Sequence, residues 1–288
     1  AESFRAVKNI KSFSFFKNFS IFGVAALLLL LPFNNTACIG VTTFVLSVFV
    51  LAIVSYVLWK KQLKNNDSVL VEKFNNKGII KDSFPMFLSG SLFLLMSWVD
   101  ILMLGHFNSQ TDVGIYTVAL KLAALCTLFL FAANTILGPK ISELYHEKKI
   151  ERLAKIVQDT AKYTFFLSTP FFVIILIFPD FLLSLFGAEF NNKLAVETLV
   201  ILSAGQMVNV FFGSVIYILD MTGKQINSRN ILLFTAIINI LLNLYLIPIY
   251  GIKGAAMATA FSIFCWTVLG AIAVKKHFGF YAFPNFKN

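Results

Sequence analysis

The stretch GIYTVALKLAALCTLFLFAANTILG (residues 114–138) decides the fold class of this chain. It is predominantly apolar, and it reaches the roughly 20 residues that a helix needs to cross a bilayer. The segment that follows at once, PKISELYHEKKIERLAK (residues 139–155), is rich in Lys and Arg. A span that ends in a basic loop predicts a membrane helix whose end lies in the cytoplasm.

The same alternation of apolar stretches and basic gaps recurs along the whole chain. The apolar stretches are residues 14–33, 37–59, 83–105, 114–138, 163–186, 195–219, 229–248 and 254–275. Most of the 24 Lys and Arg residues lie in the head, the tail and every second gap, whereas the other gaps hold only Lys193 and Lys253. The pattern predicts an all-α membrane protein. We expect a polytopic helical bundle of about eight transmembrane helices in the inner (cytoplasmic) membrane, with both ends cytoplasmic.

Composition narrows the class of function. With 58% hydrophobic and 13% charged residues, the chain lies outside the usual range of soluble domains. The net charge of +10 does not indicate nucleic-acid binding, because the basic residues flank apolar spans, where they meet anionic membrane lipids. The three Cys and three His residues are scattered, so we expect no metal site and no bound cofactor. The short outer gaps leave no room for an outer catalytic domain, which argues against an enzyme.

The gaps also predict the domain organisation. We expect residues 1–62 to carry two spans, residues 63–82 to form a basic cytoplasmic loop and residues 83–278 to form a six-helix bundle. Residues 279–288 would be a C-terminal tail. Apolar positions at helical spacing within residues 139–162 predict either an amphipathic helix on the membrane surface or an extension of a neighbouring span.

Asp100 and Lys121 are the charged residues that lie deepest inside predicted spans. A charge at the centre of a membrane helix costs about 2.5–3.5 kcal/mol on insertion scales, so such residues face a partner or a cavity. At about 1.5 Å per residue, both lie roughly 7–11 Å below the outer surface. They are expected to form either a structural ion pair or a cationic substrate site with its carboxylate partner.

Two further spans carry polar stripes. Gln206, Asn209, Gly213 and Asp220 point to similar sides of one helix at 100° per residue, and Thr235, Asn239 and Asn243 are spaced four apart on the next. Hydrogen bonds between helices or a water-lined path would both produce such stripes. Gly254, Ala258 and Ser262, also four apart, predict close packing of the last helix. Pro170 lies within a span and predicts either a hinge or a static kink.

An ordered set of short strings carries a family resemblance. The strings are SWVDILMLGHF (97–107), VGIYTVALKL (113–122), GPKISELY (138–145), LFGAEF (185–190), MTGK (221–224) and NLYLIPIYGIKGAAMATAFS (243–262). Their content and order resemble the second half of Wzx-like polysaccharide-biosynthesis flippases of the MATE/MOP superfamily. The resemblance covers about residues 80–278. Members usually have at least twelve spans in two facing bundles, so the resemblance implies a chain that lacks four N-terminal spans.

The resemblance implies a transporter that flips a polyprenyl-pyrophosphate-linked oligosaccharide across the membrane by alternating access, for surface polysaccharides such as O-antigen, lipopolysaccharide or exopolysaccharide. Lys121 would attract the pyrophosphate, and Asp100 would hold Lys121 or carry a coupling H⁺ or Na⁺. Gln206, Asn209, Asn239 and Asn243 would meet the sugars. Polysaccharide polymerase or assembly proteins would be partners.

Three alternatives stay open. A MATE-like cation-coupled drug or metabolite exporter would favour an acidic and aromatic cavity, whereas this sequence offers a buried Lys beside its Asp. A lipid II-type flippase would use the same chemistry on a different glycan. A membrane-embedded glycosyltransferase or polymerase would need paired carboxylates or a large outer loop, and the sequence has neither in a recognisable spacing.

Overall fold

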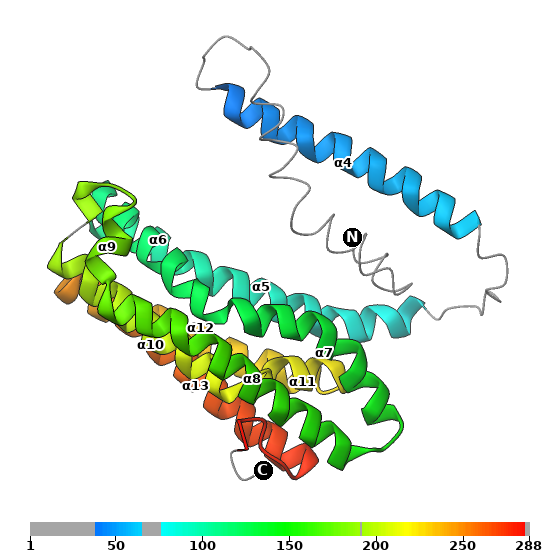
Figure 1. Ribbon diagram of the computed structural model, residues 1–288. Helices are drawn as coiled ribbons and strands as arrows, with labels where there is room; N and C mark the ends of the chain where they lie inside the picture. The colour runs from blue at the N-terminus through cyan, green and yellow to red at the C-terminus, as the bar shows by residue number, and fades with distance from the viewer. Residues whose placement is uncertain (1–37, 65–75, 191, 286–288) are drawn as a thin grey trace. The chain divides into compact units, whose positions relative to one another are not determined.

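The chain divides into two compact units, Ala1–Phe74 and Asn75–Asn288. The computed structural model describes residues 38–64, 76–190 and 192–285 (Figure 1). In the first unit it describes one helix, α4 (Cys38–Lys64), which includes the predicted span at 37–59 from Cys38 onward. The other predicted span of this unit, residues 14–33, lies outside the described residues.

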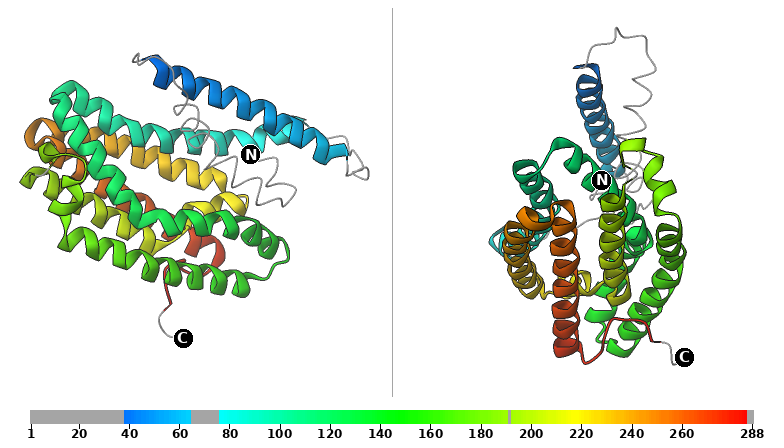
Figure 2. Two further views of the ribbon diagram at one scale, coloured as in Figure 1. Left: turned by 45° about the horizontal axis from the view of Figure 1, so that its top comes forward. Right: turned by 90° about the vertical axis from the view of Figure 1, so that its left-hand side faces the viewer.

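The second unit is a bundle of long helices with short connections (Figures 1 and 2). Its elements in chain order are α5 (Asn76–Phe107), α6 (Gln110–Ala124), η2 (Leu125–Thr127), α7 (Leu128–His146), α8 (Ile150–Ile177), α9 (Pro179–Ser184), η3 (Ala188–Phe190), α10 (Lys193–Phe212), α11 (Val215–Met221), α12 (Gln225–Tyr250) and α13 (Ile252–Phe278). The part of the chain that the structure describes contains no strand, so the all-α prediction is confirmed.

Six segments of this unit are long and apolar enough to cross a membrane. They are Phe87–Phe107, Gln110–His146, Ile150–Ile177, Lys193–Phe212, Gln225–Tyr250 and Ile252–Phe278. The second of them joins α6 and α7 through the short 3₁₀ turn η2. Large apolar side chains such as Leu102, Ile136 and Tyr245 are more than 60% exposed on the bundle surface, as lipid contact requires. The chain is therefore a multi-pass membrane protein.

The segment between the second and third spans corrects one expectation. Residues 139–162 do not form a separate surface helix, because α7 continues to His146 and α8 begins at Ile150. The apolar side chains that predicted an amphipathic helix instead face each other across this helical hairpin. Ile141 and Leu144 of α7 pack in one buried cluster with Leu153 of α8. The alternative interpretation, extension of the neighbouring spans, is the correct one.

Other boundaries also differ from the sequence prediction. The predicted span at 163–186 is interrupted, because α8 ends at Ile177 and a separate short helix, α9, begins at Pro179. Helix α5 already begins at Asn76, so residues 76–82 of the expected loop are helical. The predicted span at 195–219 is two helices, because Gly213 adopts φ +70° and ends α10. A positive φ is open to glycine but rare for other residues. A Cβ at Gly213 would also lie 3.1 Å from the Ala161 Cβ atom.

Helix starts and turns have recognisable local causes. The Ser109 hydroxyl accepts a hydrogen bond from the Asp112 backbone N–H at 3.2 Å, and the Asp112 carboxylate accepts one from the Ser109 backbone N–H at 3.3 Å. This capping box fixes the start of α6. Between α12 and α13 the chain reverses at a single residue, Gly251, whose φ is +56°.

The reversal at Gly251 presses α12 and α13 together, and the predicted small-residue packing is confirmed. Gly254, Ala258 and Ser262 are all buried on α13. A Cβ atom on Gly254 would lie 2.2 Å from the Leu246 carbonyl oxygen of α12. No side-chain movement can relieve a contact with backbone, so only glycine fits at this position.

We expect Gly254→Ala to destabilise the protein, because overpacking against a backbone atom costs about 1–3 kcal/mol, more than the ~1 kcal/mol that Ala gains over Gly in a helix. Gly90→Ala is the matched control, since an added Cβ at Gly90 of α5 meets nothing within 4 Å. Thermal unfolding in detergent, followed by size-exclusion chromatography, measures both. A Gly254→Ala protein as stable as Gly90→Ala would contradict the packing described here.

Candidate functional site

The Asp100 carboxylate lies at the centre of a buried hydrogen-bond network. The Tyr116 hydroxyl donates to its Oδ2 atom at 2.9 Å, and the Thr259 hydroxyl donates to the same oxygen. The Asn243 side-chain amide donates to Oδ1 at 2.5 Å and also to the Asn239 side-chain oxygen at 3.2 Å. Asp100 is 2% exposed, and Asn239 is 1% exposed. A buried carboxylate requires such donors, because an unpaired charge in the bilayer is very costly.

The network joins four helices. Asp100 is on α5, Tyr116 on α6, Asn239 and Asn243 on α12, and Thr259 on α13. The four helices are separate segments of the chain, so the carboxylate holds together elements that are distant in sequence. One acceptor is left over: the Asn243 Oδ1 atom is buried and has no hydrogen-bond partner in the part of the chain that the structure describes. An unpaired oxygen beside a carboxylate can accept a hydrogen bond or coordinate a cation.

The expected pairing of Asp100 with Lys121 is wrong. Both oxygen atoms of Asp100 accept hydrogen bonds from neutral side chains. Lys121 is exposed on α6 and forms no ion pair with any described residue. The physical reason is helix rotation, since Tyr116 and Ala119 turn into the core on the side of α6 that Lys121 does not share.

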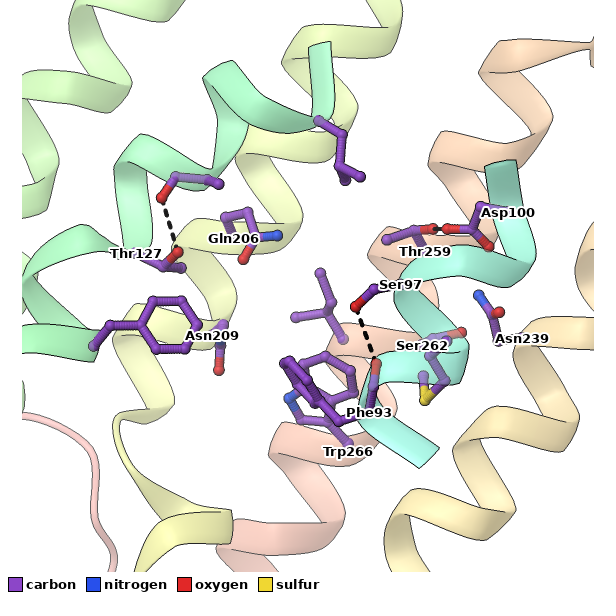
Figure 3. Close-up of a pocket in the computed structure, with 15 residues that line it drawn as sticks. Phe93, Ser97, Asp100, Thr127, Gln206, Asn209, Asn239, Thr259, Ser262 and Trp266 are labelled. Carbon is purple, nitrogen blue, oxygen red and sulfur yellow. Dashed lines mark hydrogen bonds between the residues drawn. The ribbon is translucent and has the colours of Figure 1, made fainter. Parts of the chain in front are cut away.

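A cavity of about 250 Å³ lies next to the network (Figure 3). Its walls come from α5, α6, η2, α7, α10, α12 and α13. In Figure 3, Gln206 and Asn209 lie on one side, Asp100, Asn239 and Thr259 on the other, and Phe93 and Trp266 together below. This volume is slightly below the ~300–1,000 Å³ of pockets that enclose a drug-sized ligand. Among the described residues that line it, Asp100 is the only ionisable one.

The structure separates the predicted polar residues into two groups. Gln206 and Asn209 line the cavity, and neither side chain has a hydrogen-bond partner among the described residues. Asn239 lines the cavity too, but its side-chain oxygen accepts from Asn243. Asn243 is fully buried behind the wall and supports Asp100. The free carboxamides are thus those of Gln206 and Asn209.

A second cavity of about 150 Å³ shares lining residues with the first. The residues that line both cavities are Phe93, Phe131, Asn209 and Trp266. The lining of the second cavity alone includes Asn134, Ser214 and Asp220. The Ser228 hydroxyl donates a hydrogen bond to Asp220, which lies on α11 beyond the span Lys193–Phe212. Burial raises the pKa of Asp220 to about 6, and the hydrogen bond from Ser228 only partly offsets this rise.

Several residues of the site were missed by sequence reasoning. Tyr116 and Thr259 read as ordinary span residues, because hydroxyl groups often bond to their own helix backbone. Phe93, Phe131 and Trp266 read as lipid-facing or core residues, since aromatic side chains are frequent in this chain, which has 33 Phe. Only the way in which the helices pack reveals that they meet.

Comparison with known families defines the class of protein. The MatE family model matches residues 85–245, which is more than half of the chain and covers most of the second unit. A second model, polysaccharide biosynthesis protein, matches residues 8–145. The chain belongs to the MatE family, and the resemblance to polysaccharide-biosynthesis members of the MATE/MOP superfamily is confirmed.

Two relatives come from Haloferax volcanii. One is a probable low-salt glycan biosynthesis flippase, 31% identical over 179 residues, which are 61% of this chain and 37% of that protein. The other is the probable flippase AglR, 31% identical over 181 residues, which are 62% of this chain and 38% of that protein. Neither relative is named as an enzyme. The matched part of this chain is therefore less than half the length of these curated relatives.

Solved structures support the same fold. A mutant MATE protein superposes with a TM-score of 0.71 at 15% identity, covering 90% of this chain and 60% of its own. A MOP superfamily transporter from Pyrococcus furiosus superposes with a TM-score of 0.56 at 20% identity, covering 73% of this chain and 47% of its own. The fold of this chain is therefore that of MATE transporters.

The raised pKa of Asp220 gives a pH-dependent stability. The pKa of Asp220 is about 6 in the folded protein and 3.8 ordinarily. Burial of the charged carboxylate therefore destabilises the folded protein fully above pH 6, and this destabilisation is absent below pH 4, where the group is protonated in both states. We expect Asp220→Asn to be more stable than the parent protein at pH 7.5, with the difference disappearing toward pH 4. Thermal unfolding from pH 4 to 8 measures it, and a difference that does not change with pH would contradict the assignment.

Proposed function

We propose that the complete protein flips a polyprenyl-pyrophosphate-linked oligosaccharide across the cytoplasmic membrane by alternating access. The observation that carries this proposal is the cavity in the membrane-spanning bundle. The neutral carboxamides of Gln206 and Asn209 line it without a hydrogen-bond partner among the described residues. Amides both donate and accept hydrogen bonds, as sugar hydroxyls do. The name of one Haloferax relative, a probable glycan biosynthesis flippase, and the match to the polysaccharide biosynthesis model support the same class of substrate. The other relative is named a probable flippase, which supports the same activity.

The position of Lys121 supports a separate site for the pyrophosphate. An exposed Lys in a membrane-spanning helix is costly against lipid, so it requires a polar or anionic neighbour. Lys121 has no anionic partner among the described residues, and it lies one residue from Leu120, which lines the larger cavity. An ammonium group acts as a point charge for phosphate. In this proposal Lys121 holds the pyrophosphate, and the cavity that Leu120 lines binds the sugars.

Asp100 is proposed as the coupling group for H⁺ or Na⁺. Three side chains already donate to its carboxylate, so it does not need Lys121 as a partner. The unpaired Asn243 Oδ1 atom and the Thr259 hydroxyl add oxygen ligands at the same place. A cation or a proton bound there would change the hydrogen bonds that join α5, α6, α12 and α13. Binding would in this way be coupled to the arrangement of the bundle.

A cation-coupled exporter of organic cations is the second candidate, and the aromatic rings of the cavity favour it. Cations bind to aromatic faces and to carboxylates. Against it stands the state of Asp100, which is 2% exposed and engaged by three donors, so that it offers little charge to a substrate.

We expect Lys121→Ala to reduce export of the surface glycan at least tenfold in a strain that lacks the gene and carries the full-length protein, because the pyrophosphate loses its counter-charge. Lys121→Arg should retain most of the export, since it keeps the charge. Lys193→Ala, at the exposed start of α10, is the matched control. Normal export by Lys121→Ala at normal protein level would exclude Lys121 as the phosphate site.

A second prediction concerns ion coupling. The thermal stability of the purified full-length protein should respond to Na⁺ in place of K⁺, or to pH, and Asp100→Asn should lose that response together with export. Asp180→Asn, at the exposed start of α9, should retain both. If Asp100→Asn exports normally and keeps the ion response, Asp100 is not the coupling group.

A further inference from the structure

Three aromatic side chains line both cavities. Phe93, Phe131 and Trp266 line the cavity beside Asp100 and also the cavity beside Asp220, and Asn209 is the only other residue that lines both. The ring centroids of Phe93 and Trp266 lie 5.4 Å apart at an interplanar angle of 42°. We call Phe93, Phe131 and Trp266 the aromatic collar. It comes from α5, α7 and α13, so packing of the bundle, not one local motif, creates it.

Two members of the collar have accessible faces. Phe131 is 55% exposed and Phe93 is 38% exposed, whereas Trp266 is 9% exposed and lies next to Phe93 (Figure 3). The accessible rings adjoin the carboxamides of Gln206 and Asn209, which have no partner among the described residues. The surface therefore combines apolar ring faces with neutral groups that both donate and accept hydrogen bonds.

This combination matches the chemistry of one ligand class. A pyranose ring has an apolar C–H face and a rim of hydroxyl groups, so it can bury its face on an aromatic ring while its hydroxyls bond to amides. A hydrophobic ion would instead leave both carboxamides unpaired, and its charge would meet an Asp100 carboxylate that three donors already occupy. The neutral polar ligand is thus favoured over the cation.

We propose that the aromatic collar binds the pyranose rings of the transported glycan by stacking on Phe93 and Phe131, with Gln206 and Asn209 as the hydroxyl-binding pair. This inference rests on the proposed function and adds a specificity-determining surface to it. Trp266 is a positioning residue that supports Phe93 from behind. Since the collar lines both cavities, a sugar in either one can contact these rings.

The test uses the purified full-length protein in lipid nanodiscs and saturation-transfer difference NMR. The probes are N,N′-diacetylchitobiose, maltose and tetraphenylphosphonium. We expect at least one disaccharide to bind, and Phe131→Leu and Phe93→Leu to weaken that binding about 3- to 10-fold, the range for loss of an aromatic contact. The single substitution Gln206→Leu should weaken disaccharide binding more than either Phe substitution does. Phe264→Leu is the control, because Phe264 is 48% exposed on α13 and lines neither cavity.

The outcomes separate this inference from the proposed function. Trp266→Leu is not used alone, since a buried position can affect folding, and the exposed Phe131 carries the decision. The inference is overturned if neither disaccharide binds, or if Phe131→Leu, Phe93→Leu and Phe264→Leu bind the disaccharides alike. Collar-dependent binding of tetraphenylphosphonium alone also overturns it and favours the organic-cation exporter. Glycan export by the same variants in the deletion strain tests the proposed function independently, because export can persist without stacking on the collar.

Discussion

The buried carboxylate of Asp100 constrains the rest of the bundle. A negative charge within a membrane-spanning helix is stable only where donors surround it. Here they come from Tyr116, Asn243 and Thr259, on three other helices. These donor side chains fix the rotation of α6, α12 and α13 about their axes. A helix rotated by one residue would point its donor away from the Asp100 carboxylate. The close contact between α12 and α13 at Gly254 adds a second constraint, because it prevents the two helices from sliding along each other.

The same constraint determines the chemistry of the cavity. The Asp100 carboxylate is already engaged by hydrogen-bond donors. The groups that the cavity lining offers to a ligand are therefore carboxamides, hydroxyls and aromatic rings, not a free charge. Rotation of α6 that brings Tyr116 to Asp100 also keeps Lys121 out of the core. Positive charge and neutral cavity are therefore on different surfaces of one bundle. A substrate with an anionic head and neutral sugars would use both, whereas an organic cation would use neither the lysine nor the amides.

The sequence predicted the spans well where the information is local. Hydropathy and charge sorting located six spans of the second unit, because lipid imposes length and polarity on each helix separately. Prediction failed where backbone geometry or helix rotation intervened. The stripe from Gln206 to Asp220 assumed one regular helix, but Gly213 breaks it. Residues 139–162 looked amphipathic because their apolar side pairs with its own hairpin partner, and periodicity cannot distinguish that partner from a membrane surface.

The sequence by itself determined that this is an all-α, multi-pass membrane protein of the MATE/MOP type, and that Asp100, Lys121, Gln206, Asn209, Asn239 and Asn243 are its exceptional polar residues. These properties follow from residue type and spacing, because the free energy of inserting each helix into the membrane depends directly on both. Only the tertiary structure decided which of these residues meet. It joined Asp100 to Asn243 and not to Lys121, left Gln206 and Asn209 without a hydrogen-bond partner among the described residues, and placed three aromatic rings in the walls of both cavities. Such contacts depend on the rotation and crossing of helices, which no single helix specifies.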